Sequence, residues 1–212
     1  MLKWKKHKPH FEFVSYGDSS VEDGHFEFIY DMVRNMKPNL MVELGSGKSE
    51  TFFSMCQAIK DDGFPAQVVT VGGWQKNSHW EVSNTDKSIK DFLYQNIGHL
   101  VSSNAKEASN LFINESIELL HIDSSLSYTS ISKDYELWLE KVKPGGAVLV
   151  HNIKESGIAS FWGEVKRKYP SLEFGHSGGL GVFYPKGVPT HLLYMVLDDK
   201  KTIQGCYSDT GS

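Results

Sequence analysis

Short apolar runs alternate with amphipathic segments along most of the chain, and this alternation predicts the fold. Continuously apolar runs, typical of strands buried on both faces of a sheet, lie at 39–45, 66–73, 99–103, 116–123 and 145–152. Segments with apolar residues at helical spacing lie at 22–37, 49–63, 84–97, 105–112, 127–142 and 159–169. Strands that alternate with helices form right-handed parallel crossovers, so we expect a three-layer α/β sandwich.

The last part of the pattern differs from the rest. Segments 171–176 and 180–185 are both strand-like, and the link between them is too short for a helix. We therefore expect them to pair antiparallel at one side of a mostly parallel, Rossmann-like sheet of about seven strands. The chain then divides into a basic N-terminal segment at 1–21, a domain at 22–190 and a C-terminal extension at 191–212.

Composition limits the classes of protein to which the chain could belong. Its 212 residues allow one good core and are few for two domains. The net charge of −4 argues against a general nucleic-acid binder. No apolar run approaches the ~20 residues that span a bilayer, and no apolar region follows the basic start as in a secretory signal. We expect a cytoplasmic protein without a transmembrane segment or a nucleic-acid partner.

The N-terminal segment carries a cluster of lysines around Trp4. The simplest interpretation is a solvated, partly disordered terminus. The alternative is a contact with phosphates or an acidic membrane surface.

Polar residues and glycines stand where the predicted strands end. Because ligands bind to open parallel sheets at the carboxyl ends of the strands, this position selects Gly45, Gly72, Ser103, Asp123 and His151. His121 and Asp123 lie on the same face of their strand, since side chains alternate along it. We expect His121 to be buried with its hydrogen bonds satisfied, and His151 to be either a rim residue or a general base.

The stretch "MVELGSGKSE" at 41–50 ends like a P-loop. A P-loop requires its first glycine where Val42 stands, and the loop after the strand is too short to wrap around phosphates. A P-loop nucleotide kinase is therefore the least favoured alternative. The better match is Glu-Leu-Gly-x-Gly at the end of the first strand, a turn that lets the backbone approach a ligand.

Together with "VKPGGAVLVHN" at 142–152, this turn resembles the class I S-adenosylmethionine-dependent methyltransferases. Longer blocks over about 39–187, among them "VTVGGWQKNSHW" and "IELLHIDSSLSYTSISKDYELWLEKV", resemble a methyltransferase family often encoded with glycan-assembly glycosyltransferases. The resemblance implies S-adenosylmethionine as the cofactor and O-methylation of a small molecule, a sugar or a glycan intermediate. It also suggests a glycosyltransferase as a partner.

The resemblance also assigns roles to residues. The implied cofactor-binding residues are Glu43, Gly45, Ser46, Gly47, Gly72, Trp74, Ser103, Asn104 and Asp123. The implied catalytic residues are His151, Asp123 and Tyr128, and the metal positions correspond to Asp123 and Asn152. Trp74 either stacks on the adenine or packs in the core.

Five positions depart from the family pattern. Ser49 and Ser124 replace glycines, Gly72 replaces the acid that grips the ribose, Leu126 replaces a histidine, and Asn152 replaces an aspartate. We expect a degenerate site that binds S-adenosylmethionine weakly or not at all and depends little on magnesium or manganese. Glu81 and Asp86 are the nearest acids that could replace the missing one. A non-catalytic binding or scaffold module of the same fold is therefore an alternative function.

Overall fold

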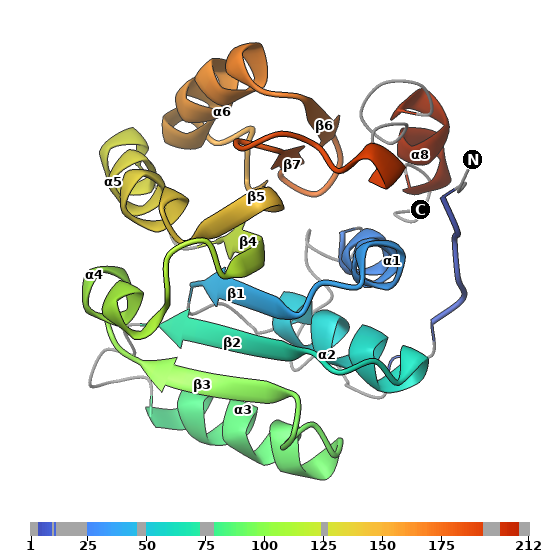
Figure 1. The fold of residues 1–212 in the computed structure, drawn as a ribbon. Coiled ribbons are helices and arrows are strands. Elements are labelled where there is room, and N and C mark those ends of the chain that lie inside the picture. The colour runs from blue at the N-terminus through green and yellow to red at the C-terminus, as the bar shows by residue number, and fades with distance from the viewer. Residues whose placement is uncertain are drawn as a thin grey trace.

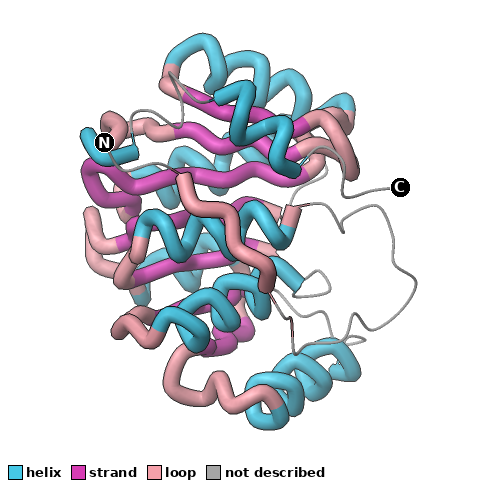
Figure 2. Tube along the Cα trace, turned by 90° about the vertical axis from the view of Figure 1, so that its right-hand side faces the viewer, coloured by secondary structure: helices cyan, strands magenta, loops and turns pink. Residues whose placement is uncertain are grey.

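A computed structural model describes residues 4–9, 11, 25–45, 50–72, 79–123, 127–192 and 200–207, with the backbone alone for 79–84. Within these ranges a seven-stranded sheet lies between two layers of helices (Figure 1). Figure 2 shows the strands stacked between the helices of the two faces. The observed architecture is the three-layer α/β sandwich that the alternating pattern predicts.

The strands follow the order β3-β2-β1-β4-β5-β7-β6 across the sheet. Their bounds are β1 Leu40–Leu44, β2 Gln67–Gly72, β3 Gly98–Ser102, β4 Ile117–Ile122, β5 Val142–His151, β6 Ser171–Phe174 and β7 Leu180–Phe183. The first five strands pair in parallel, and β7 pairs antiparallel with both β5 and β6. The predicted antiparallel pairing at the C-terminal side is therefore confirmed.

β5 begins earlier than the apolar run indicates, because it includes the Pro-Gly-Gly sequence expected to be a turn. Val142 pairs with Ile117, and the register then shifts between Ile117 and Leu119. β7 pairs with β5 only from Val148 onward. Pro144 thus lies where the strand has no β7 neighbour, a position that tolerates the missing N–H of proline.

The helices are α1 Phe26–Met36, α2 Glu50–Asp62, α3 His79–Asp91, α4 Ala105–Ala108, α5 Tyr128–Leu139, α6 Ser156–Lys168 and α8 Lys200–Tyr207, with short 3₁₀ turns η1 Ser109–Leu111 and η2 Thr190–Leu192. The prediction of a helix at 84–97 is wrong at both ends, since α3 begins at His79 and ends at Asp91. After α3, Leu93 takes a left-handed conformation at φ 60°. This turn places the fully buried Tyr94 in the core, where its hydroxyl donates to Gln57 Oε1 at 2.5 Å.

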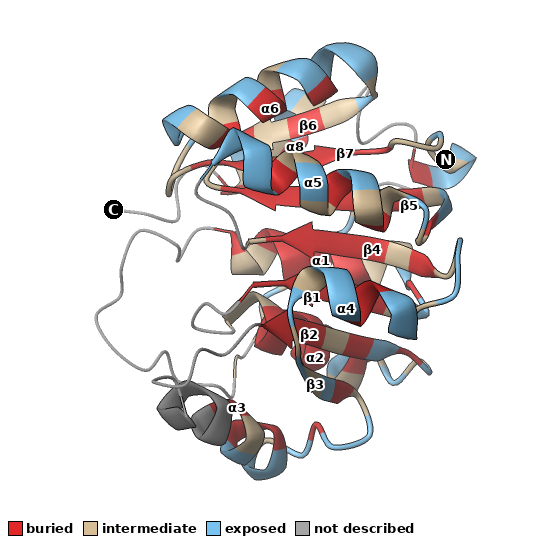
Figure 3. Ribbon diagram, turned by 90° about the vertical axis from the view of Figure 1, so that its left-hand side faces the viewer, coloured by how far each residue is buried: buried red, intermediate tan, exposed pale blue. Residues whose placement is uncertain are grey.

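Two hydrophobic cores lie on opposite faces of the sheet. Side chains of α1, α2 and α8, such as Phe28, Phe52 and Ile203, cover one face. Side chains of α5 and α6, such as Trp138 and Phe161, cover the other. The central strands β1, β4 and β7 are buried over nearly their whole length, whereas most of edge strand β3 is partly or fully exposed and the outer surfaces of the helices are exposed (Figure 3).

The two ends of the described chain meet on α1, in a cluster that we call the chain-end clasp: Trp4, His7, Asp31 and Tyr207. The Trp4 ring stacks on Phe28, and its indole N–H donates to the Tyr207 hydroxyl at 2.9 Å. The Tyr207 hydroxyl donates to Asp31, which also accepts from the His7 backbone N–H at 3.0 Å and from His7 Nδ1 at 2.6 Å.

Within residues 4–9, Trp4 and His7 thus contact α1 and α8, whereas Lys5, Lys6 and Lys8 are exposed, so the expectation of a solvated terminus holds for the lysines and not for the two rings. Lys6 donates to the Cys206 carbonyl oxygen at 2.5 Å, with its ammonium group over the Tyr207 ring. The large aromatic side chain of Trp4 accounts for this packing. In the sequence, the lysines around Trp4 suggested a segment exposed to solvent. No helix in the described ranges is both long and apolar enough to cross a membrane.

Candidate functional site

The carboxyl ends of the parallel strands form a continuous edge, which we call the strand-end rim: Gly45, Gly72, Ser103, Asp123 and His151. The Gly45 N–H donates to the Val71 carbonyl at 3.0 Å, and the Ser103 N–H donates to Gly72 at 3.2 Å. The Asp123 N–H donates to Leu44 at 2.8 Å. The rim residues selected from the sequence therefore lie side by side in the order of the sheet.

Gly45 makes the closest backbone approach in the rim. Its φ is +155°, and a Cβ at this position would lie 3.1 Å from the Asp123 carbonyl oxygen and 3.3 Å from Asp123 Cβ. Glycine is therefore required for the ends of β1 and β4 to touch. The role of Gly45 in cofactor binding remains a prediction.

On the rim, Asp123 and His151 form a carboxylate–imidazole pair in which His151 is buried and Asp123 is partly exposed. His151 Nδ1 lies 3.3 Å from Asp123 Oδ1, and the two side chains are 5% and 20% exposed. Burial raises the pKa of Asp123, but the hydrogen bond from His151 and the positive charges of His121 and His151 outweigh it and leave that pKa below its ordinary value. Because Asp123 accepts from Nδ1, the neutral His151 ring carries its lone pair on Nε2.

A second such pair, Glu43 with His121, lies deeper in the sheet and is buried. Glu43 Oε2 accepts from His121 Nδ1 at 3.1 Å, and Glu43 Oε1 accepts from the Thr70 hydroxyl at 3.3 Å. His121 is fully buried, as expected, but its Nε2 has no hydrogen-bond partner in the described ranges. Among the described residues, His121 therefore has a hydrogen-bond partner at Nδ1 and none at Nε2. The Glu43 carboxylate is bound by protein donors, and its predicted contact with a cofactor is untested.

Two further histidines, His25 and His176, complete the cluster around His151. His25, immediately before α1, is 2% exposed. Its ring meets the His151 ring edge-on at 5.3 Å and stacks on the His176 ring at 4.4 Å. Burial, followed by the charges of His151 and His176, lowers the pKa of His25 to about 3. Sequence reasoning did not find His25, because an isolated histidine ahead of a helix carries no motif.

Other predicted site residues have structural partners. Asn104 caps α4, since its Oδ1 accepts from the Glu107 N–H at 2.9 Å. The Ser103 hydroxyl donates to the Glu107 carboxylate at 3.3 Å. The Tyr128 hydroxyl is on the surface and donates to Glu164 of α6 at 2.9 Å. Each of these three side chains thus has a hydrogen-bond partner within the protein. Their cofactor-binding or catalytic roles remain predictions.

The predicted metal position at Asn152 faces a neighbouring turn. A Cβ on Gly178 would lie 2.5 Å from Asn152 Oδ1, so the amide lies against the Gly178 backbone. In the described parts of the chain, no group of three or more His, Cys, Asp or Glu residues has an arrangement that could hold a metal ion. Asp86, one candidate for the missing acid, is exposed and pairs with Lys90 at 2.5 Å.

Several predicted positions lie outside the described residues: Ser46, Gly47, Ser49, Trp74, Ser124 and Leu126, together with the Glu81 side chain. That the cofactor-binding residues line one cavity therefore stays a prediction.

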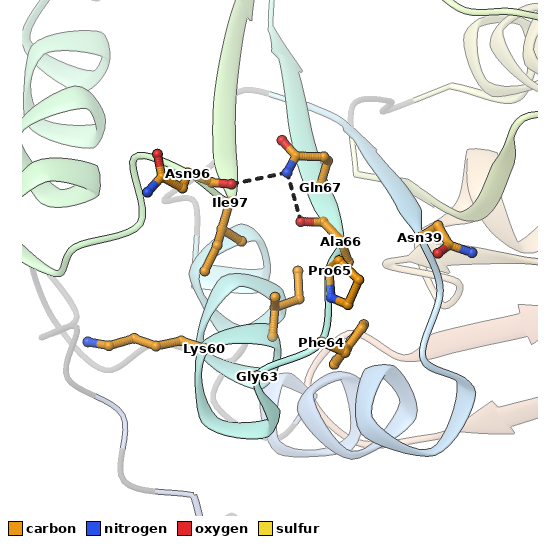
Figure 4. Close-up of a pocket in the computed structure, with 10 residues that line it drawn as sticks. Asn39, Lys60, Gly63, Phe64, Pro65, Ala66, Gln67, Asn96 and Ile97 are labelled. Carbon is orange, nitrogen blue, oxygen red and sulfur yellow. Dashed lines mark hydrogen bonds between the residues drawn. The ribbon is translucent and has the colours of Figure 1, made fainter.

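A separate hollow of about 600 Å³ lies at the amino ends of the parallel strands, between the end of α2 and the start of β3 (Figure 4). Phe64 and Pro65 line it, and Gln67 Nε2 at its border donates to the Asn96 and Ala66 carbonyls, each at 3.0 Å. None of the predicted site residues lines this hollow.

Comparisons with known proteins identify a methyltransferase domain in this chain and methyltransferases of the same fold. A family model described as a methyltransferase domain matches residues 42–153. An uncharacterized protein of Sinorhizobium fredii, y4gI, is 27% identical over 161 residues, which cover 72% of this chain and 18% of that protein. The chain therefore spans about a fifth of the length of this curated relative.

Solved methyltransferases share the fold. A methyltransferase from Geobacter sulfurreducens superposes with a TM-score of 0.63 at 13% identity, covering 77% of this chain and 80% of that one. The O-methyltransferase from Bacillus cereus, solved in complex with SAH, gives 0.57 at 14% identity, with 79% and 82% covered. At such low identity the likeness establishes the fold alone, which is the Rossmann-like methyltransferase fold.

Proposed function

This chain belongs to the methyltransferase-domain family, and we propose that it transfers a methyl group from S-adenosylmethionine to an oxygen atom of a small-molecule acceptor. The observation that carries the proposal is the Asp123–His151 pair at 3.3 Å on the strand-end rim. Family membership leaves the kinase alternative without support.

The rim offers a partial fit to the cofactor. Gly45 brings the ends of β1 and β4 into contact, so the first turn of the rim lies directly beside Asp123. Ser103 presents a hydroxyl from the neighbouring junction. Gly72 fits less well, because it has no carboxylate for the ribose hydroxyls that the resemblance places there. We infer that Gly45, Gly72 and Ser103 would hold the cofactor, and that the affinity is low.

His151 is suited to act as a general base. The bound cofactor would supply an electrophilic methyl group, and an acceptor hydroxyl must lose its proton as its oxygen forms the new bond. His151 Nε2 would take that proton, while Asp123 holds Nδ1–H and stabilises the positive charge that forms on the ring. The depressed pKa of Asp123 keeps its carboxylate ionised for this task.

The sequence resemblance alone supports the finer parts of the proposal. It favours a sugar or glycan intermediate as the acceptor and a glycosyltransferase as a partner. The alternative of a non-catalytic binding module is favoured by one observation, the absence of an acid at Gly72.

Isothermal titration with S-adenosylmethionine tests cofactor binding. We expect weak binding by the wild type, and Gly72→Asp should strengthen it by about 1.5–3 kcal/mol, the range for a hydrogen bond to a charged group. Gly72 lies in β2 and pairs regularly with Ser102, so its backbone has the extended conformation that residues with a side chain adopt. Gln67→Asp, at the exposed far end of β2, adds the same charge away from the rim and should leave binding unchanged.

Three results would contradict this account. Micromolar or tighter binding by the wild type would show that the site is not degenerate. Binding of ATP but not S-adenosylmethionine would overturn the methyltransferase proposal. Cofactor binding without formation of S-adenosylhomocysteine across a panel of hydroxylated probes would favour the non-catalytic module.

A further inference from the structure

β6 is the last strand on one side of the described sheet, so half of its backbone groups point away from β7. In the antiparallel pair of the two strands, the Tyr184 N–H donates to the Pro170 carbonyl oxygen at 3.1 Å. Because bonded and non-bonded residues alternate along such a pair, Leu172 also bonds to β7. The N–H and C=O groups of Ser171 and Glu173, on either side of Leu172, therefore point outward.

α8 lies along this outer edge and bonds to it through two side chains. Lys200 Nζ donates to the Ser171 carbonyl oxygen at 3.0 Å, and Gln204 Nε2 donates to the Glu173 carbonyl oxygen at 2.5 Å. A helix rises about 6 Å over four residues, and a strand rises about 6.6 Å over two. Side chains four residues apart on α8 therefore reach alternate carbonyl groups of β6, which are the outward ones.

Apolar contacts hold the same face of α8 against the sheet. Ile203 and Tyr207 are buried in the core that contains Leu172 of β6. Lys201 and Thr202, on the outer side of α8, are exposed. The inner face of α8 thus combines apolar contacts with two donors that match the outward carbonyl groups of β6.

We propose that α8 is a cover for a strand-pairing edge, and that the partner that fits this edge is β6 of a second copy of the chain. Open sheet edges add strands through their outward N–H and C=O groups. Because side-chain donors occupy both outward carbonyl groups, the edge is closed while α8 is in place. The inference concerns assembly and does not depend on the proposed methyl transfer.

The sequence of β6 favours one way of pairing two copies. Antiparallel pairing about Leu172 places Ser171 opposite Glu173 of the second copy, and the backbone groups of both residues point outward. Leucine then meets leucine on the core side. Pairing about Glu173 would instead place two carboxylates opposite each other, which is destabilising. The favoured arrangement is two-fold symmetric, with the same contacts on both copies.

Lys200→Ala combined with Gln204→Ala tests the cover, because this double variant loses both donors and keeps the buried side chains of α8. Sedimentation velocity over a concentration series should show self-association at least about tenfold stronger than in the wild type, since two hydrogen bonds no longer oppose displacement of α8. Hydrogen exchange should show new protection of the Ser171 and Glu173 amides as the double variant associates. The Leu172 amide, which bonds to β7, should be protected throughout.

Ser171→Pro, added to the double variant, should restore the monomer, because proline lacks an outward N–H that β7 does not use. Lys201→Ala with Thr202→Ala is the matched control on the exposed side of α8, and it should leave the assembly state unchanged. Ile203→Ala loosens the packing of α8 but retains both donors, so it should associate less than the double variant. If the proline variant does not fold, hydrogen exchange of the double variant decides the question.

The inference is wrong if the double variant sediments like the wild type at every concentration. Association without new protection at Ser171 and Glu173, or association that a folded proline variant does not reduce, would indicate contact through another surface. Association of Ile203→Ala as strong as that of the double variant would show that packing, and not the two donors, closes the edge.

Discussion

Gly45 shows how one side chain could disturb the rim. In Gly45→Ala the new Cβ would lie 3.1 Å from the Asp123 carbonyl oxygen, at a φ of +155° that L side chains rarely adopt. We expect a loss of about 1–3 kcal/mol in the free energy of unfolding, from backbone strain and overpacking. Urea denaturation measures this change.

Gly205→Ala provides a comparison of opposite sign. Gly205 lies inside α8, and a Cβ there meets nothing within 4 Å. Alanine should raise stability by about 0.5–1 kcal/mol, because it loses less backbone freedom than glycine. Equal stabilities of Gly45→Ala and the wild type would show that the contact with Asp123 is not restrictive.

Residue-level reasoning from the sequence succeeded where position along a strand determines the environment. It located Gly45, Asp123 and His151 on one edge, because parallel strands end together. It missed His25 and His176, because their contacts depend on how α1 and the β6–β7 turn pack on the sheet. It also missed the Glu43–His121 bond, which depends on a strand register that the apolar pattern does not reveal.

At the scale of elements, α8 is attached to α1 through Tyr207. Burial raises the pKa of Asp31, while hydrogen bonds from Tyr207 and His7 act against this effect. Tyr207→Phe removes one donor from a buried carboxyl group, so we expect a loss of about 1–3 kcal/mol in the free energy of unfolding. Chemical denaturation of both proteins gives the difference.

Tyr128→Phe controls for the loss of a tyrosine hydroxyl. Tyr128 is 39% exposed and bonds Glu164 at the surface, so its change should stay within about 0.5 kcal/mol. A Tyr207→Phe protein as stable as Tyr128→Phe would mean that the Tyr207 hydroxyl contributes nothing to holding α8.

The sequence predicted strands better than helix ends for a physical reason. A strand buried on both faces is mostly apolar, as β1 and β4 are apart from Glu43, Glu118 and His121. The start of α3 was misplaced because Thr85, a good capping residue, lies inside the helix and is buried with Ser88 on its inner face. Tertiary packing therefore overrides the local capping preference there.

At the scale of the whole molecule, the histidine cluster makes stability depend on pH. The pKa of His25 is about 3 in the folded protein against 6.5 in the unfolded chain. Below pH 6.5 the unfolded chain therefore binds a proton that the folded protein does not, and stability falls by up to about 1.4 kcal/mol per pH unit until the folded pKa is reached.

His25→Phe should remove this component. Urea denaturation at about pH 7.5 and about pH 5 should show a larger acid-induced loss in the wild type than in the variant. Asp123 does not contribute in this range, because a carboxyl group whose pKa is lowered in the folded protein loses its stabilising effect only below its ordinary pKa of 3.8. Equal losses would show that His25 is protonated in the folded protein.

The chain-end clasp places Trp4 beside Tyr207, with 2.9 Å between the indole nitrogen and the hydroxyl oxygen. A longer polypeptide that carried this domain would therefore enter it and leave it at nearly the same point. Such a domain can be inserted into a surface loop of a host protein without stretching the host, because closing so short a gap costs little entropy. The same geometry makes the fold suited to circular permutation, with the old ends joined beside Asp31 and new ends opened elsewhere.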